Sequence, residues 1–367
     1  MKQYVIKWLE TQNRWQCNAA RESGERKTFT SSEPGRKGKA IVTKKVHDWM
    51  EDDFVEQNIK VENLHKRWVE ELKLTSSTSK ISLAKSLFKN HIIPEIGTKK
   101  VSALSEQDLQ NVINEAYKRG MGRVTLANIR VYLSLFIKYA RKNKITKLVP
   151  IDVEIPKEAI RNEKQVLQPA DIKKLFTPSE NRYIHAFRFQ FLLGLRPGEL
   201  IGLTWDCISG DTLTIKQSIN IFNETTSGKN KNAHRSIMLP KLAKDELKAQ
   251  EEMLRAENIV HGLAEAKQKV KVSLFIFPSR DGEHIRAKSY YYHWSEYAAK
   301  NKIKATAPYS LRHTFISINK STPLALLKQV VGHSDAMDTI GTYSHQQDGD
   351  LEQIKILVDS LIDEILN

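Results

Sequence analysis

The chain has 367 residues, of which 40% are hydrophobic and 28% charged, a composition typical of folded domains and a length that predicts two or three of them. No apolar stretch is long enough to cross a bilayer, and the start MKQYVIKWLETQNR lacks the apolar core of a signal peptide, so we expect a cytoplasmic protein with no membrane partner. Cys17 and Cys207 are too few for a disulfide scaffold or a cysteine-rich zinc site. The net charge of +15 favours nucleic acid as partner, because cations set against phosphates release condensed counterions; solvated lysines are the alternative.

Residues 1–56 have the composition of a small basic module. They contain eleven Lys or Arg and three tryptophans, Trp8, Trp15 and Trp49. The segment VTKKVHDWMEDDF begins with a threonine that can cap a helix and continues at helical spacing. Scattered tryptophans favour a miniature core over the alternative, a flexible basic arm.

Residues 57–148 show helical periodicity. Leu64, Trp68 and Leu72 share one helical face, and Ser105 followed by Asp108 predicts a capped helix start. A longer helix is expected from about residue 125, with cations on its outer face. We predict an all-α bundle of four helices with basic outer faces that could contact DNA; a bundle with merely solvated lysines is the alternative.

Residues 149–166 contain two prolines and no sustained period, which predicts an exposed linker between domains. From residue 167 the pattern becomes mixed. Helices are expected through Leu175 and from Phe187 to Leu193, followed by the strands TLTIKQSINIF and RSIMLP and the short buried strand VSLFIFPS. The remainder is helical, so residues 167–345 are predicted to form a mainly α, α+β domain.

The sequence lacks the motifs of two common kinds of phosphate chemistry, which use a bound nucleotide or a zinc ion. There is no GxxxxGK[ST] loop to hold a nucleotide and no HExxH zinc motif. His313, His333 and His345 have no Cys or paired carboxylates at ligand spacing. We therefore expect no metal and no cofactor, and chemistry carried out by cationic side chains.

Five short segments follow one another in the last 180 or so residues. They are GLRPGELIGLTW around Arg196, GKNKNAHRSIMLP around Lys229, YSLRHTF around Arg312, VVGHS around His333 and IGTYSH around Tyr343. In this order they resemble the signature of the tyrosine recombinase family, the integrases of phages and conjugative transposons. The signature has an Arg in an L-R-x-x-E turn, a Lys in a β-hairpin, a His-x-x-Arg box, a Gly-His pair, and a Tyr about ten residues later.

The resemblance extends over essentially the whole chain and implies a multidomain plan. Residues 1–56 would form an arm-type DNA-binding domain, residues 57–148 a SAM-like core-binding domain, and residues 167–345 the catalytic domain.

The resemblance also implies a role for each residue of the signature. Tyr343 is the nucleophile, and its attack on a DNA phosphate leaves a 3′-phosphotyrosyl bond and a free 5′ hydroxyl. Arg196 and Arg312 hold the nonbridging oxygens, where negative charge grows in the transition state. His333 assists the tyrosine as it loses its proton, since a phenol with an unperturbed pKa near ~10 is a poor nucleophile at neutral pH.

The leaving 5′ oxygen needs a general acid, and Lys229 is the first candidate. Lys231, two residues on and on the same side of a strand, is the alternative. Glu199 is expected to orient its surroundings, while the roles of His313 and His345 stay open.

One position departs from the family pattern, because the His expected three residues before Arg312 is Tyr309. A phenol can donate a hydrogen bond to a phosphate oxygen but cannot act as an imidazolium. We predict that the hydroxyl of Tyr309 donates to a nonbridging oxygen of the scissile phosphate.

Residues 346–367 contain six acidic residues and one lysine, with apolar residues at helical spacing. A helix that packs in its own domain is one interpretation. The resemblance offers another, in which the helix after the tyrosine docks on a neighbouring protomer.

The function predicted on these grounds is site-specific DNA recombination that integrates or excises a mobile element. The partners implied are double-stranded DNA with core and arm attachment sites, three further copies in a homotetramer on synapsed DNA, a directionality factor and a DNA-bending host protein. One alternative is a type IB topoisomerase-like relaxase, against which the basic N-terminal module and the tail argue. Another is a DNA-binding regulator without activity, against which Tyr343 and the three cations argue.

Overall fold

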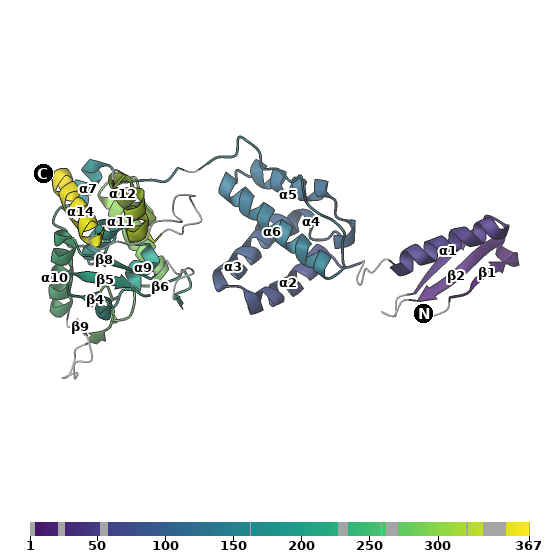
Figure 1. Ribbon diagram of the computed structural model, residues 1–367, viewed down its shortest axis with the longest axis horizontal. Helices are drawn as coiled ribbons and strands as arrows, with labels where there is room; N and C mark the ends of the chain where they lie inside the picture. Colours follow the sequence, from purple (N-terminus) through teal and green to yellow (C-terminus); the bar gives the residue numbers. More distant parts are fainter. Residues whose placement is uncertain are drawn as a thin grey trace. The chain divides into compact units, whose positions relative to one another are not determined.

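The computed structural model describes residues 4–20, 26–51, 58–161, 163–226, 234–257, 259–261, 271–320, 322–332 and 350–366 (Figure 1). The chain divides into two units, Met1–Asn162 and Glu163–Asn367. The first contains two separate hydrophobic cores and the second contains one. Among the described helices, none is long and apolar enough to cross a membrane.

The N-terminal module is a three-stranded antiparallel sheet with one helix on it. The strands β1 (Ile6–Leu9), β2 (Arg14–Ala20) and β3 (Arg26–Ser31) lie in chain order, and α1 (Gly35–Glu51) runs along one face (Figure 1). A 3-10 turn, Glu10–Gln12, joins the first two strands. The miniature core that the sequence predicted is present, because alternate strand residues meet the apolar stripe of α1. This core consists of Cys17, Ala19, Phe29, Val42, Val46 and Trp49.

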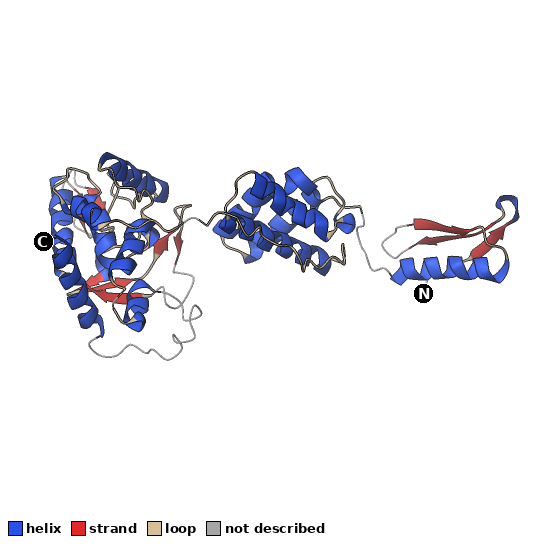
Figure 2. Cartoon of the chain, turned by 90° about the horizontal axis from the view of Figure 1, so that it is seen from above, coloured by secondary structure: helices blue, strands red, loops and turns tan. Residues whose placement is uncertain are grey.

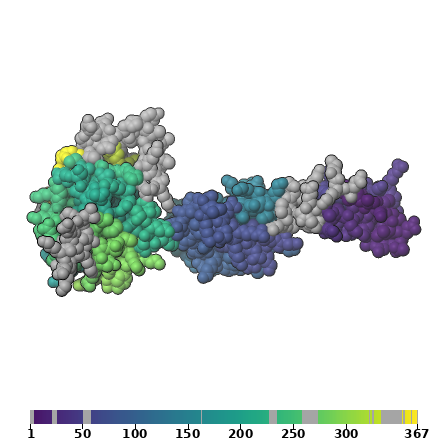
Figure 3. Space-filling model, turned by 90° about the horizontal axis from the view of Figure 1, so that it is seen from below, coloured from purple at the N-terminus to yellow at the C-terminus, as the bar shows by residue number. Residues whose placement is uncertain are grey.

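The middle of the chain is the predicted helical bundle, seen in blue in Figure 3. Its longer helices are α2 (Val61–Thr75), α3 (Thr78–Leu87), α5 (Glu106–Lys118) and α6 (Arg123–Lys142). A π-helical turn (Phe88–Ile92), the short α4 (Ile93–Ile96) and a 3-10 turn (Val101–Ala103) connect α3 to α5.

The start of α5 and the interior of the bundle agree with the sequence pattern. The Ser105 hydroxyl accepts from the backbone N–H of Asp108, and the Asp108 carboxylate accepts from that of Ser105, which is the predicted capping box. In the interior, Trp68, Phe88 and Phe136 pack edge to face or tilted, with ring centroids 5.1–5.7 Å apart.

Residues 149–161 of the predicted linker are mostly exposed, but a few of their side chains and backbone groups are held on the bundle. Val153 and Ala159 are buried in the bundle core. The Gln110 side chain accepts from the Glu154 backbone N–H at 2.8 Å and donates to its carbonyl at 3.1 Å. A stretch without a regular period can still be ordered when its few apolar side chains are buried and its backbone polar groups find side-chain partners.

The second unit is mainly helical, with small sheets (Figure 2). Its helices are α7 (Pro169–Phe176), α8 (Ile184–Leu193), α9 (Pro197–Ile201), α10 (Lys241–Ala256), α11 (Ala287–Lys300), α12 (Tyr309–Ile318), α13 (Leu324–Val331) and α14 (Asp350–Leu366). Its strands are β4 (Ile208–Ser209), β5 (Thr212–Ile215), β6 (Ser218–Ile219), β7 (Thr225–Thr226), β8 (Arg235–Met238), β9 (Ile259–His261) and β10 (Lys271–Ser273). A 3-10 turn, Trp205–Cys207, precedes β4.

The β5–β8 pairing confirms the predicted hairpin partners, with Thr212 opposite Met238 and Ile215 opposite Arg235. The first predicted strand, however, is broken after β5. At the break the Lys216 ammonium donates to the Asp206 carboxylate at 2.8 Å, and the Gln217 side-chain amide donates to the Gly202 carbonyl at 2.9 Å. The predicted strand VSLFIFPS is reduced to β10 followed by isolated bridges, with Leu274 exposed.

The acidic tail forms α14, which packs against α7, β8 and α13 of its own unit. Val358 and Ile362 are buried there, and the Asp359 carboxylate accepts from the backbone N–H of Lys241 at 3.0 Å. The single chain therefore shows the own-domain arrangement. Docking on a neighbouring protomer stays a prediction.

Candidate active site

Arg196 lies at the start of α9, directly after a tight turn. The turn is made by Gly194, whose φ of +60° is the left-handed conformation in which glycine ends α8. A Cβ atom on Gly194 would lie 2.4 Å from the ring of Phe315, so the glycine also lets α12 approach this turn closely. Arg196 donates from Nη1 to the Glu199 carboxylate at 2.6 Å.

Arg312 extends from α12 into the same turn. Its side chain is 1% exposed, and its Nη1 donates to the Gly194 carbonyl at 2.8 Å. Its Nη2 donates to the Val331 carbonyl at 2.7 Å. Burial, and secondly the charge of Arg196, lower the pKa of Arg312 from its usual value to about 10, which leaves the guanidinium charged at neutral pH.

Glu199 is buried between two arginines. Besides Arg196, the carboxylate accepts two parallel hydrogen bonds from Arg235 of β8, at 3.0 and 2.9 Å. Burial by itself would raise the pKa of Glu199, but the hydrogen bonds and charge of Arg235, with the charge and backbone N–H of Arg196, lower it from 4.5 to about 2. The orienting role expected for Glu199 stays a prediction.

Arg235, the third charged residue of this cluster beside Arg196 and Glu199, was not among the predicted site residues. A signal was present, because Arg235 is two residues before the buried Ile237 in a strand and therefore points to the same inward face. A charged side chain at an inward position needs a buried partner of opposite charge. Which carboxylate supplies it depends on the fold.

Tyr309 is the first residue of α12, one turn before Arg312 and His313. It is 36% exposed, and its ring lies 5.2 Å from that of His313. Tyr309 also acts on Arg312 electrostatically, in the direction that raises the pKa of Arg312. Burial, followed by the charges of Lys164 and Arg312, lowers the pKa of His313, which favours the neutral imidazole.

The structure brings together Arg196, Arg312, Glu199 and Tyr309 from the predicted set. The other predicted residues, Lys229, Lys231, His333, Tyr343 and His345, lie outside the described residues. Within the described part of the chain, no group of His, Cys, Asp or Glu is arranged to bind a metal ion.

Two family models match the chain. The model of the phage integrase family matches residues 165–349, and that of the SAM-like N-terminal domain of phage integrases matches residues 60–117.

Curated relatives include a tyrosine recombinase XerC-like protein from Caldanaerobacter subterraneus, 23% identical over 67% of this chain and 68% of its own length. An integrase of Streptomyces ambofaciens is 25% identical over 71% of this chain and 69% of its own.

Solved structures with the same fold include the Tn1549 transposon integrase in complex with a circular intermediate DNA, at a TM-score of 0.65 and 16% identity. That match covers 82% of this chain and 99% of the solved one. A lambda integrase tetramer bound to a Holliday junction is similar at a TM-score of 0.56 and 13% identity, over 95% and 97% of the two chains.

A mainly helical catalytic unit with small sheets, two clustered arginines and a SAM-like helical domain before it define the class of tyrosine-type site-specific DNA recombinases. This chain belongs to the phage integrase family. The prediction of this family from the ordered motifs is thereby confirmed.

Proposed function

We propose that this recombinase cleaves and rejoins double-stranded DNA through a 3′-phosphotyrosyl intermediate on Tyr343, and so integrates or excises a mobile element. The observation that supports this most directly is the convergence of Arg196 and Arg312. They come from α9 and α12, yet they donate to the adjacent carbonyls of Gly332 and Val331, at 2.9 and 2.7 Å. Such a pair supplies donors for the charge that grows on the nonbridging oxygens.

In the proposed step the Tyr343 oxygen forms a bond to phosphorus as the bond to the 5′ oxygen breaks. The leaving oxygen takes a proton from Lys229 or Lys231, and the tyrosine proton passes to a base for which His333 is the candidate. His333 follows Gly332 directly in the chain, next to the carbonyls that the arginines bind. The covalent link preserves the energy of the phosphodiester, so a hydroxyl of another strand can reverse the step.

The experiment is a nicked suicide substrate whose cleaved fragment diffuses away and traps the adduct. Wild-type protein in excess EDTA without ATP should form an SDS-resistant adduct, and Tyr343→Phe should bind the DNA without forming one. A strand-exchange assay then separates recombination from simple relaxation. Cleavage by Tyr343→Phe, or loss of the wild-type adduct on chelation with recovery in Mg²⁺, would contradict the proposal.

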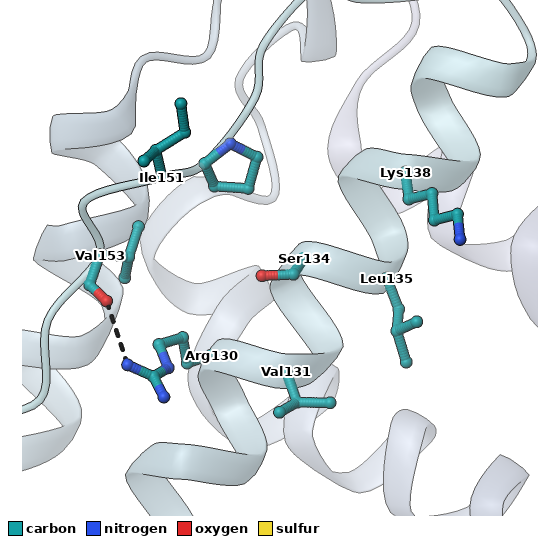
Figure 4. A pocket seen from close by; sticks show the side chains of 8 residues that line it. Arg130, Val131, Ser134, Leu135, Lys138, Ile151 and Val153 are labelled. Atoms are coloured by element: carbon teal, nitrogen blue, oxygen red, sulfur yellow. Dashed lines mark hydrogen bonds between the residues drawn. The ribbon is translucent and has the colours of Figure 1, made fainter.

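The bundle supplies a surface for core-site DNA in this proposal. A hollow beside α6 has a mixed apolar and cationic lining (Figure 4). It is lined by Arg130, Val131, Ser134, Leu135 and Lys138 on the helix and by Pro150, Ile151 and Val153 on the segment after it. A second hollow is lined by four cations and a threonine: Lys138, Arg141, Lys142, Thr146 and Lys147. Cations along one helix are suited to a run of phosphates.

The N-terminal module is proposed to bind arm sites with the sheet face opposite α1. That face carries polar or cationic side chains at alternate positions, namely Lys7, Arg14, Gln16, Asn18, Arg26 and Thr28. The Thr28 hydroxyl donates to the Asn18 amide oxygen at 2.8 Å, and Arg14 donates to that of Gln16 at 3.0 Å. A sheet of this kind fits the major groove, where amides can read base edges.

The arm proposal is tested with the double variant Gln16→Ala and Asn18→Ala. We expect it to weaken binding to arm DNA while cleavage of a core-site suicide substrate is unchanged. The double variant Thr11→Ala and Gln12→Ala, in the exposed turn between β1 and β2, is the control. Equal arm affinity in both variants would count against the assignment of this face.

The assembly is proposed to be a homotetramer on synapsed DNA, with α14 docking on a neighbour and with a directionality factor and a DNA-bending host protein as further partners. The lambda integrase, bound to a Holliday junction as a tetramer, supports this by its shared fold. Deletion of residues 350–367 should then weaken synaptic complexes on native gels more than binding to a single site. Unchanged synapsis in this truncation would count against the docking.

A further inference from the structure

We propose that Arg235 is a positioning residue of the active site, which holds Arg196 through Glu199 and fixes the end of α13 from which the His333 segment continues. This inference rests on the proposed function. It concerns a residue of β8 within the segment GKNKNAHRSIMLP, for which the family signature implies no role.

The observation behind the inference is a set of three consecutive carbonyls. Arg235 donates from Nε to the carbonyl of Val330, Arg312 donates to that of Val331 at 2.7 Å, and Arg196 donates to that of Gly332 at 2.9 Å. These carbonyls belong to the last turn of α13 and its cap. The guanidiniums come from β8, from α12 and from the residue that caps the start of α9.

A helix end is a suitable point for such a contact. The last carbonyls of a helix lack partners within the helix, and the helix dipole favours cations there. Gly332 ends α13 with a φ of +64°, which turns the chain away from the helix axis. Three cations therefore hold the last turn of α13 and its glycine cap, the residue that precedes His333 in the chain.

Arg235 and Arg196 differ in burial, and we infer from this that they differ in role. The Arg235 side chain is 7% exposed, whereas that of Arg196 is 31% exposed and accessible to a phosphate. Both guanidiniums share the Glu199 carboxylate. Without Arg235, Glu199 would have Arg196 as its one hydrogen-bonded cation among the described residues, and we expect Arg196 to shift toward it and away from Gly332.

The test compares Arg235→Lys with Arg188→Lys, a control of the same chemistry. Arg188 is also buried and donates to the Glu246 carboxylate at 3.2 Å. It also binds the carbonyls of Leu175, near the end of α7, and Thr177, directly after α7, at 2.8 and 2.6 Å. Lysine keeps the charge in each variant but cannot make the several directed bonds of a guanidinium. Each variant is measured for its melting temperature, its DNA affinity and its single-turnover cleavage rate at saturating suicide substrate.

We expect Arg235→Lys to cleave about 10- to 100-fold more slowly with nearly unchanged DNA affinity, because displacement of a catalytic group by about 1 Å can cost a hundredfold in rate. Arg188→Lys should lower the melting temperature similarly but cleave at the wild-type rate. Equal cleavage rates in the two variants would overturn the inference.

A second measurement separates positioning from general loss of stability. In a methylphosphonate substrate a methyl group replaces one charged nonbridging oxygen, which lessens the need for the Arg196 guanidinium. The ratio of wild-type to Arg235→Lys rates should fall on this substrate, and an unchanged ratio would contradict action through Arg196. Should Arg235→Lys not fold, the double variant Glu199→Gln with Arg235→Gln leaves no unpaired buried charge at these two positions and should show the same slow cleavage.

Different results would overturn the proposed function and the inference about Arg235. If wild-type protein forms no adduct, the proposed function is wrong. If wild-type protein forms the adduct and Arg235→Lys forms it equally fast, only the inference is wrong.

Discussion

Two buried glutamates of the catalytic unit have similar partners, yet only one belongs to the candidate active site. Glu199 pairs with Arg196 and Arg235, and Glu246 pairs with Arg188 at 3.2 Å and with Nδ1 of His185 at 2.6 Å. A buried ion pair by itself therefore does not identify a catalytic centre.

What distinguishes the Glu199 cluster is its connection to accessible groups. Arg196 keeps nearly a third of its side chain exposed, and it binds the carbonyl of Gly332, the residue before His333 in the chain. Both partners of Glu246, in contrast, are mostly buried. An ion-pair network can hold a fold together anywhere, but it can act on a substrate only where one member reaches the surface.

The largest effect is expected when the accessible guanidinium itself is removed. Arg196→Gln should slow single-turnover cleavage by about 100- to 1,000-fold, the usual cost of losing one donor to a transition-state oxyanion. Arg188→Gln, its counterpart in the Glu246 cluster, should leave the rate at saturating DNA unchanged. A comparable rate loss in both variants would remove the distinction between the two clusters.

The next effect concerns stability and pH. The pKa of Glu199 is lowered from 4.5 to about 2 in the folded protein, so its contribution is present above the unfolded pKa and is lost as pH falls toward 2. A shift of this size corresponds to about 3 kcal/mol. The difference in unfolding free energy between wild type and Glu199→Gln, measured with urea, should be largest above about pH 5 and shrink on acidification.

The matched variant for this prediction is Glu246→Gln, which removes the other buried carboxylate without touching Arg196. It should lower stability but leave the cleavage rate at saturating DNA unchanged, whereas Glu199→Gln should reduce both. A pH-independent difference for Glu199→Gln would show that its charge is not what stabilises the folded state.

The smallest effect is expected for a neutral donor. Tyr309→Phe should slow cleavage by about ten- to a hundredfold, because a hydrogen bond to a charged acceptor is worth roughly 1.5–3 kcal/mol. Tyr309→His should retain more activity, since imidazole restores a donor. Tyr297, whose hydroxyl donates to the Lys174 carbonyl at 3.2 Å near Arg188, gives the control Tyr297→Phe. This control should lose about 1 kcal/mol of stability and no activity.

The sequence by itself determined the class of the protein and much of its local structure. The ordered motifs identified Arg196 and Arg312, and the Ser105 capping box and the β5–β8 pairing follow the predicted pattern. Capping boxes and alternating strands depend on residues a few positions apart, so a local pattern is enough to reveal them.

Only the tertiary structure decided which groups surround the two arginines. Arg235 meets Glu199 because β8 and α9 pack in the same core, and nothing near either residue in the sequence specifies the other. The packing of Val153 and Ala159 on the bundle was likewise not predictable, since they show no period and are buried by distant helices. Long-range packing brings these partners together, and a local sequence pattern does not specify which distant residues become neighbours in the fold.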